Sequence, residues 1–322
     1  MILGKKVSTG ILAIVLLALN TGFMSAKASS LDHSTQKRMV IFGDSYSDNG
    51  NDYRLTAGRY PNAVAYYQGR FSNGPVWVEY LAQRLGINPS NPQQFINFAY
   101  GQSKILSATS ITVYCATNQQ YVVPGLSDEI SAYEAQYKKF KPSDLVVVFI
   151  STNDFFDLSD VNDRNFFLKA ADYQVVQIHR LIQLGAKHLV VLNGRDVTLS
   201  PLARIIASTN TGSMDNAKIT NYLHYFRSLI QLYNNRLGDA LRHAKEVVLY
   251  DTFHFDNKTF NKIQNNQMCY QNQQGDYQNV AGAICGNSSQ FFYYDRIHTT
   301  SSVNELLAND VYYQVNKRLG IH

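Results

Sequence analysis

The residues of this sequence best suited to covalent chemistry are a serine near its beginning and an acid–base pair near its end. Ser45 follows a short apolar run, residues 39–42, and a glycine. Asp295 and His298 stand three positions apart. A serine hydroxyl attacks an acyl carbon when a histidine takes its proton and a carboxylate orients that histidine. Together these residue types predict acyl transfer, with Ser45 as nucleophile, His298 as base and Asp295 as the carboxylate.

Two further residues, Gly101 and Asn153, are candidates to stabilise the negative charge that develops in such a reaction. Each follows a predicted strand. With the backbone N–H of Ser45, the backbone N–H of Gly101 and the side-chain amide of Asn153 would form an oxyanion hole, in which one donor typically contributes about 3 kcal/mol. Taken singly, a glycine or asparagine after a strand is more often a turn or cap residue. The prediction therefore depends on the joint occurrence of all these residues.

Apolar runs of strand length alternate with segments of helical periodicity along most of the chain. This alternation predicts a three-layer αβα sandwich, with helices on both faces of a doubly wound parallel sheet of about five strands. The carboxyl ends of parallel strands share one edge of a sheet, which would bring Ser45, Gly101 and Asn153 together. The predicted strands are 39–42, 94–100, 144–150, 187–192 and 247–250, and the predicted helices are 76–82, 127–140, 168–184, 219–244 and 302–319.

Two long stretches lack clear periodicity. Residues 49–70 are rich in Asn, Gly, Arg and Tyr and are expected to form a surface loop. Residues from about 256 to 292 are rich in Asn and Gln and are expected to form a loop insertion. Loops of this length in compact domains are often functional, and this one directly precedes the acid–base pair. Our hypothesis is that it acts as a lid or regulatory loop.

The chain contains three cysteines, of which two lie in this insertion. Three single pairings are possible. We favour Cys269 with Cys285, a short closure that would stabilise the fold by about 3 kcal/mol and leave Cys115 unpaired. The alternative is three buried thiols that do not bond.

The first 28 residues have the features of a secretory signal peptide. Lys5 and Lys6 precede an apolar stretch, residues 11–19, and Ala26 and Ala28 provide a small-x-small cleavage site. Cleavage after Ala28 removes three lysines and lowers the formal net charge from +5 to +2. A nearly neutral exported chain is not expected to bind nucleic acid. We expect residues 29–322 to form one domain that is secreted to a bacterial periplasm or the medium.

Several other chemistries lack their sequence motifs. The chain contains no Gly-x-Ser-x-Gly, no Gly-x-Gly-x-x-Gly, no phosphate-binding loop and no His-Glu-x-x-His. Its eight histidines are scattered, which gives a metal site little support. We therefore expect neither a metal nor another cofactor.

The chain resembles the GDSL group of SGNH hydrolases. Gly43-Asp44-Ser45 is similar to the first conserved block of that group, residues 97–101 (NFAYG) to the second, Asn153-Asp154 to the third, and Asp295-x-x-His298 to the last. The resemblance implies the SGNH fold and the roles given above for Ser45, Gly101, Asn153, Asp295 and His298. Two positions depart from the group's pattern: Tyr46 stands where Leu is usual, and Ser151 where Gly is usual.

Two longer stretches are similar to one branch of this group, the secreted bacterial lysophospholipases A and glycerophospholipid:cholesterol acyltransferases. They are residues 45–51 (SYSDNGN) and residues 69–82 (GRFSNGPVWVEYLA). This resemblance implies a lysophospholipid or phospholipid substrate, a sterol or other alcohol as a further acyl acceptor, and peripheral contact with a membrane. It leaves the oligomeric state open.

Two other functions remain open at this point. A carbohydrate or short-chain esterase would use the same scaffold and the same residues. A non-catalytic surface-binding module would keep the fold and lose the activity. Twenty-two Tyr and 17 Phe would suit an acyl groove, but most of them are expected to pack in the core.

Overall fold

A parallel sheet of five strands lies at the centre of the residues that the structure describes. Its order is β2 (Phe95–Asn97), β1 (Met39–Gly43), β5 (Leu145–Phe149), β6 (His188–Leu192) and β7 (Val247–Tyr250). Every neighbouring pair is parallel. The chain reverses its direction of progress across the sheet between β1 and β5, and open α/β sheets bind ligands at such a switch point. Ser45 follows β1 at that point.

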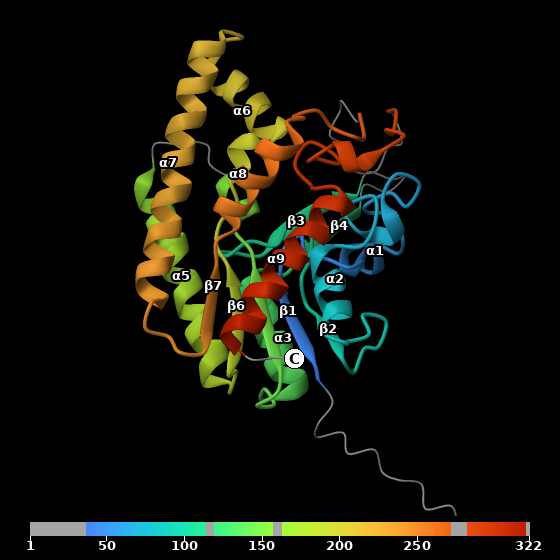
Figure 1. Cartoon of the computed structure of the whole chain (residues 1–322), viewed down its shortest axis with the longest axis vertical. Helices are drawn as coiled ribbons and strands as arrows, with labels where there is room; N and C mark the ends of the chain where they lie inside the picture. Colours follow the sequence, from blue (N-terminus) through green and yellow to red (C-terminus); the bar gives the residue numbers. More distant parts are fainter. Residues whose placement is uncertain (1–36, 114–118, 157–162, 272–281, 320–322) are drawn as a thin grey trace, which may run out of the picture. The chain divides into compact units, whose positions relative to one another are not determined.

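This computed structural model describes residues 37–113, 119–156, 163–271 and 282–319, which belong to one compact unit, Gln36–His322. The predicted signal peptide, residues 1–28, and Cys115 lie outside the described residues. Figure 1 shows the arrangement of the elements.

The strands form because their apolar residues are buried on both faces of the sheet. In β1, Met39 and Ile41 pack into one hydrophobic core, while Val40 and Phe42 pack into the other. This alternation follows from the two-residue period of a strand. All five residues of β1 and all five of β5 are buried, which explains their uninterrupted apolar sequence.

Helices cover both faces of the sheet, so the predicted three-layer αβα architecture is confirmed (Figure 1). Side chains of α2 (Trp77–Arg84) and α9 (Ser301–Leu319) pack into one core. Side chains of α3 (Leu126–Tyr137), α5 (Arg164–Gln183) and α7 (Asn216–Leu241) pack into the other. Asp163 and Asp215 cap α5 and α7 by accepting hydrogen bonds from backbone N–H groups of the first turn.

Several elements of the structure were not predicted from the sequence. The predicted surface loop 49–70 contains α1 (Asn51–Leu55) and a 3₁₀ turn, η1 (Tyr67–Gly69). The polar stretch after Gly101 contains an antiparallel pair, β3 (Thr109–Val113) with β4 (Gln119–Val123). The other unpredicted elements are α4 (Thr152–Phe156), η2 (Val197–Leu199), α6 (Pro201–Thr211), α8 (Thr252–Ile263) and η3 (Ser288–Gln290).

Helix α8 corrects the predicted start of the loop insertion. Residues 256–263 are helical, so the irregular connection begins after Ile263. The helix begins at an Asp251 cap and presents Phe255 to the core, a short amphipathic pattern that the Asn-rich composition obscured. Within the insertion, Cys269 and Cys285 form the predicted disulfide. An isolated bridge pairs Met268 with Tyr293, two residues before Asp295.

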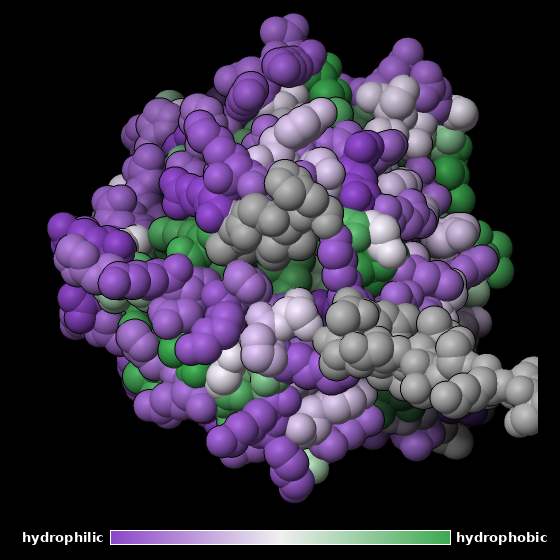
Figure 2. Space-filling view, turned by 60° about the horizontal axis from the view of Figure 1, so that its bottom comes forward, coloured by the Kyte–Doolittle hydropathy of each residue, from purple (hydrophilic) through white to green (hydrophobic). Residues whose placement is uncertain are grey.

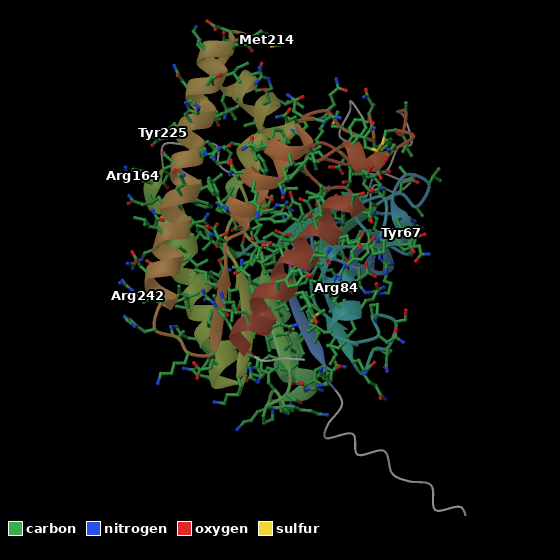
Figure 3. The ribbon with its side chains drawn as sticks, in the orientation of Figure 1. Tyr67, Arg84, Arg164, Met214, Tyr225 and Arg242 are labelled. Carbon is green, nitrogen blue, oxygen red and sulfur yellow. A yellow bond between two sulfur atoms is a disulfide. The ribbon has the colours of Figure 1, made fainter. Side chains whose placement is uncertain are left out.

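Hydrophilic residues cover most of the face shown in Figure 2, and hydrophobic residues appear there in small areas. Helices α6 and α7 form a hairpin, and Met214 in its turn is 83% exposed (Figure 3). Among the described residues, no helix has both the length and the apolar character needed to cross a bilayer.

A buried ion pair joins the beginnings of two central strands. The guanidinium of Arg38 donates to both carboxylate oxygens of Asp144, with an Nε–Oδ1 distance of 2.8 Å. We expect Arg38→Met to lower the free energy of unfolding by about 3 kcal/mol, because it leaves a buried carboxylate without its cation. Chemical denaturation measures this loss. The double variant R38M/D144N, which removes the charge as well, should recover part of it, and unchanged stability of R38M would show that the pair contributes nothing.

Candidate active site

The turn that carries Ser45 is held tightly against the neighbouring strand. The backbone N–H of Asp44 donates to the carbonyl of Phe149 at 3.2 Å. A Cβ atom at Gly43 would lie 2.3 Å from that carbonyl oxygen, so only glycine fits there. The backbone N–H of Gly43 donates to the carboxylate of Glu129, at 2.9 Å. Ser45 is thereby fixed just beyond the end of β1, and it is 6% exposed.

The predicted acid, base and nucleophile form one chain of hydrogen bonds. The His298 Nε2 atom lies 2.8 Å from the Ser45 Oγ atom, and the His298 Nδ1 atom lies 2.7 Å from Asp295 Oδ2. The other Asp295 oxygen accepts the backbone N–H groups of Ile297 and His298, at 2.9 and 2.7 Å. A tight turn supports this pair, since the N–H of Tyr294 donates to the carbonyl of His298. The geometry lets His298 take the Ser45 proton while Asp295 orients the imidazole ring.

The surroundings of Asp295 keep it ionised. Burial alone would raise the pKa of this carboxyl, but the charge of His298 and the hydrogen bonds from its ring and from the two backbone N–H groups outweigh burial. The pKa of Asp295 therefore lies below its ordinary value. An ionised carboxylate is what stabilises an imidazolium during proton transfer.

A tyrosine that the sequence analysis did not select completes the surroundings of the acid. The Tyr66 hydroxyl donates to Asp295 Oδ2 at 2.9 Å, and this side chain is only 1% exposed. Tyr66 lies in the stretch predicted as a surface loop. Nothing in its sequence context distinguishes it from the other tyrosines, because its role depends on a contact between residues 229 positions apart.

Two of the three predicted oxyanion donors have internal acceptors in this structure. The N–H of Gly101 donates to Asp48 Oδ2 at 3.1 Å, and the side-chain amide of Asn153 donates to the carbonyl of Ser103 at 2.9 Å. Among the described residues, the N–H of Ser45 has no hydrogen-bond acceptor. Gly101 lies against Phe71, whose ring centroid is 5.0 Å from that of His298. The oxyanion-hole assignment therefore stays a prediction.

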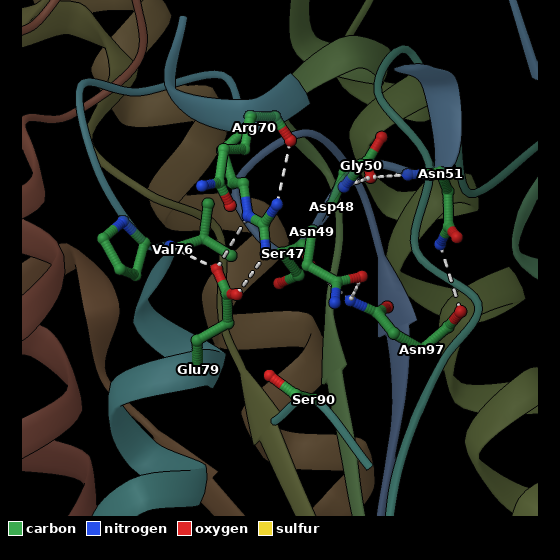
Figure 4. A network of polar contacts seen from close by, with 12 residues as sticks. Ser47, Asp48, Asn49, Gly50, Asn51, Arg70, Val76, Glu79, Ser90 and Asn97 are labelled. Atoms are coloured by element: carbon green, nitrogen blue, oxygen red, sulfur yellow. Dashed lines mark hydrogen bonds and ion pairs between the residues drawn. The ribbon is translucent and has the colours of Figure 1, made fainter. Parts of the chain in front are cut away.

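Polar side chains join the loops that follow β1 and β2 (Figure 4). The carboxylate of Asp48 accepts the N–H groups of Gly50, Asn51 and Asp52 in addition to that of Gly101. The amide of Asn51 donates to the carbonyls of Asn97 and Ala99. The amide of Asn97 in turn donates to the carbonyl of Ser47, at 2.7 Å. These contacts fix Gly101 relative to Ser45.

One buried carboxyl group in this region is unpaired. Among the described residues neither oxygen of Asp52 has a hydrogen-bond partner, although the side chain is fully buried. Burial, and next the charges of Asp48 and Glu129, raise the pKa of Asp52 well above its ordinary value. A Cβ at Gly101 would lie 2.4 Å from the Asp52 carboxyl, so Asp52 packs directly under that glycine.

The segment that carries Asn153 and Asp154 has a defined position, although Ser151 stands just before it where the family usually has glycine. Ser151 is buried, and the following residues form α4, which carries Asn153. The carboxylate of Asp154 accepts the N–H groups of Ile105 and Leu106, at 2.8 and 3.3 Å. Burial raises the pKa of Asp154 to about 7. These hydrogen bonds position the segment that begins at Ser103. The carbonyl of Ser103 accepts the hydrogen bond from the Asn153 amide.

Comparison with known sequences agrees with this geometry. Residues 39–311 match the profile of the family described as GDSL-like lipase/acylhydrolase. The chain belongs to this family. In this GDSL-family esterase/lipase, Ser45, Asp295 and His298 meet beside the carboxyl end of β1. Among the described residues, no group of three or more His, Cys, Asp or Glu side chains is arranged to hold a metal ion.

Relatives within the GDSL family include bacterial and plant proteins. The chain is 28% identical over 225 residues to a phosphatidylcholine-sterol acyltransferase of Aeromonas hydrophila, covering 67% of this chain and 64% of that protein. It is 24% identical to a GDSL esterase/lipase of Arabidopsis thaliana, covering 94% of this chain and 95% of that protein. A solved structure of a lipolytic G-D-S-L family protein from Veillonella parvula aligns with 87% of this chain and 97% of that chain, at a TM-score of 0.45 and 12% identity.

The unpaired carboxyl of Asp52 leads to a prediction about pH and stability. Its folded-state pKa is raised, so the folded state binds this proton more tightly than the unfolded state. The resulting contribution to stability is complete below the unfolded pKa of about 3.9 and is lost as pH rises through the folded pKa. We expect Asp52→Asn, which cannot ionise, to be more stable than the parent at pH 8 and to lose less stability between pH 4 and 8.

Urea denaturation across this pH range measures the effect. Asp48→Asn is the matched control, because Asp48 accepts four backbone N–H groups and its replacement should destabilise the fold by about 1–3 kcal/mol. A pH dependence of D52N identical to that of the parent would mean that Asp52 titrates normally.

Proposed function

We propose that this protein hydrolyses the acyl esters of lysophospholipids and phospholipids, with Ser45 as the nucleophile. The observation that carries the proposal is the continuous hydrogen-bonded chain from Ser45 through His298 to Asp295. A buried serine hydroxyl bonded to an imidazole that is itself bonded to a carboxylate is the arrangement needed for a covalent acyl-enzyme.

The reaction has two halves. In the first, Ser45 Oγ attacks the ester carbonyl carbon while its proton passes to His298 Nε2, and the imidazolium returns that proton to the leaving alcohol as the C–O bond breaks. In the second, a water molecule attacks the acyl-serine and gives its proton to His298. The bond between the acyl carbon and Ser45 Oγ then breaks, His298 returns the proton to Ser45 Oγ, and the fatty acid leaves. Asp295 stays ionised throughout and stabilises the transient imidazolium.

The negative charge on the carbonyl oxygen requires donors at the sheet edge. In the proposed mechanism the N–H of Ser45, the N–H of Gly101 and the amide of Asn153 supply them. The N–H of Gly101 exchanges Asp48 for the oxyanion, whereas the Asn153 amide keeps one N–H on the carbonyl of Ser103 and offers its second N–H to the oxyanion. Each donor contributes about 3 kcal/mol to lowering the barrier.

Two observations support a lipid substrate: the name of the Aeromonas relative and the position of Arg296. The Aeromonas relative is named for phosphatidylcholine and for a sterol acceptor, and we extend both to this chain. Arg296 lies between the acid and the base, is partly exposed, and among the described residues has no ion-pair partner. Its Nε atom is buried without a hydrogen-bond partner. A lipid phosphate would give this guanidinium the partner it lacks.

Access to lipid is supported by exposed apolar side chains on the α6–α7 hairpin. Ile205 and Met214 are 43% and 83% exposed. The hairpin adjoins the catalytic loop, since the N–H of Leu202 in the first turn of α6 donates to the carbonyl of Arg296. We infer peripheral contact with a membrane through this hairpin. The Cys269–Cys285 disulfide supports export to an oxidising compartment.

Replacing the nucleophile tests the mechanism. We expect Ser45→Ala to lower fatty-acid release from a lysophosphatidylcholine by at least about 10⁴-fold, because no acyl-enzyme can form. Ser90→Ala, an exposed serine, serves as the matched control with parental activity. Thermal unfolding confirms that both variants are folded. Activity of S45A equal to that of the parent would refute the mechanism.

Activity on a series of esters distinguishes a lipid esterase from the two alternative functions. The parent protein should cleave long-chain acyl esters faster than acetyl esters, and addition of a sterol should divert part of the acyl group to a sterol ester. A preference for acetylated carbohydrates would replace the lipid proposal by the short-chain alternative. Failure to react with a serine-directed phosphonate would favour a non-catalytic binding module.

The unpaired Arg296 predicts head-group dependence. We expect Arg296→Gln to raise KM for lysophosphatidylcholine about 10-fold, which corresponds to the loss of one charge-assisted hydrogen bond of about 1.4 kcal/mol. KM for a monoacylglycerol with the same acyl chain should not change, since it carries no phosphate. Arg242→Gln, an exposed arginine at the C-terminal end of α7 and away from the hairpin turn, is the control. Equal changes for both substrates would show that Arg296 does not recognise phosphate.

A further inference from the structure

The residue after the nucleophile contacts the loop that carries the base. Tyr46 is 4% exposed, and its hydroxyl donates to the carbonyl of Ile297 at 2.8 Å. Its ring centroid lies 5.7 Å from that of the His298 imidazole. Burial raises the pKa of Tyr46, so the phenol remains a neutral donor at any pH used for an ester assay. Leucine, the usual residue at this position in the family, has no donor for the Ile297 carbonyl.

A buried cation lies over the ring of Tyr46. The guanidinium carbon of Arg195 is 4.4 Å from the Tyr46 ring centroid, and Arg195 is 3% exposed. A cation over an aromatic face is attracted by its quadrupole, most strongly where water is excluded. The same guanidinium lies 5.9 Å from the ring of Phe149, at the end of β5. Arg195 therefore packs between the sheet edge and the tyrosine that contacts the catalytic loop.

An ion pair fixes the guanidinium in this position. Arg195 donates twice to Asp256 of α8, with Nε–Oδ2 and Nη2–Oδ1 distances of 3.0 and 2.6 Å. Asp256 is 2% exposed and also accepts the N–H of Asp196. Among the described residues the third nitrogen, Nη1, has no partner. A buried pair of this kind is costly to desolvate and is often replaceable by apolar residues without loss of stability. Stability alone therefore does not account for Arg195.

We propose that Arg195 is a positioning residue for His298 and acts through Tyr46. The Asp256–Arg195 pair fixes the Tyr46 ring, and the Tyr46 hydroxyl fixes the Ile297 carbonyl, one residue before the base. This keeps His298 Nε2 within hydrogen-bond distance of Ser45 Oγ. Neither Arg195 nor Tyr46 touches the reacting atoms, so their effect falls on the rate of the chemical step and not on substrate binding.

Three single variants and one double variant test this role. Tyr46→Phe removes only the hydroxyl, Arg195→Met removes the cation, and Arg195→Lys keeps the charge without the planar fork. Because the role rests on the esterase chemistry proposed above, but not on the lipid, the substrate is a soluble p-nitrophenyl ester of medium chain length. Failure of the lipid proposal would leave this assay intact, and an inactive parent would indicate failure of the esterase chemistry itself.

We expect kcat to fall about 10-fold in Y46F and about 10–100-fold in R195M, with KM within about twofold of the parent, since small displacements of catalytic groups have effects of this size. R195K should regain part of the loss. The double variant Y46F/R195M should lose no more than R195M alone, because both changes act on the same histidine. Inactivation by a serine-directed phosphonate should slow in parallel.

The control is Arg38→Met, which breaks a buried ion pair at the opposite end of β1. It should match the loss of stability in R195M and keep the parental kcat at temperatures well below unfolding. Equal kcat losses in both variants, a change confined to KM, or multiplying losses in the double variant would overturn the proposal. If R195M does not fold, Y46F still tests the proposal. An unchanged kcat in Y46F would exclude positioning of His298 through Tyr46.

Discussion

Buried carboxylates that accept backbone N–H groups hold the active-site loops together. The turn after β1 and the segment after β2 have no regular ladder to satisfy their peptide groups. Glu129 accepts the N–H of Gly43, Asp48 accepts four N–H groups, and Asp154 accepts two. A buried N–H without an acceptor costs more than the hydrogen bond itself contributes, so these carboxylates are what permits an irregular backbone at the sheet edge.

The acidic residues of the site fall into two groups according to whether the protein raises or lowers their pKa. Burial raises the pKa values of Asp44, Asp48, Asp154 and Glu129, and those of Asp44 and Asp154 rise to about 6 and about 7. Asp295 is equally buried, yet its pKa is lowered because its partners include a base that becomes positively charged. Environments that separate pKa values in this way assign different tasks to chemically similar groups. Among these acids, Asp295 is the one whose carboxylate is hydrogen-bonded to the imidazole of His298.

The sequence was informative where periodicity or a motif reports on contacts. The uninterrupted apolar runs of β1 and β5 predicted buried parallel strands, and the shared edge of three strand ends placed Ser45, Gly101 and Asn153 together. Residues 49–70 gave no such signal. Asp52 and Thr56 in that stretch are fully buried, although no apolar stripe marks them: Asp52 packs under the distant Gly101, and Thr56 donates to the nearby carbonyl of Asp52. Tyr66 belongs to the same class, since its partner Asp295 is specified only by the fold. The short helix α8 was hidden by an Asn-rich composition of low helical propensity.

Gly101 and Asn153 already donate hydrogen bonds within the protein. These bonds influence how much more strongly the two donors bind the transition state than the ground state. In the proposed mechanism, the Asn153 amide keeps one N–H on the carbonyl of Ser103 and offers its second N–H to the substrate oxygen. A hydrogen bond from this second N–H to a neutral ester carbonyl gains little, whereas one to an oxyanion is charge-assisted and stronger. The interaction is therefore stronger in the transition state, which is the condition for raising kcat. Gly101 differs, because its present acceptor is a carboxylate group. The exchange of a carboxylate for an oxyanion replaces one charge-assisted hydrogen bond by another and gains less. Asn153 should accordingly contribute more than Gly101 to the selective stabilisation of the transition state.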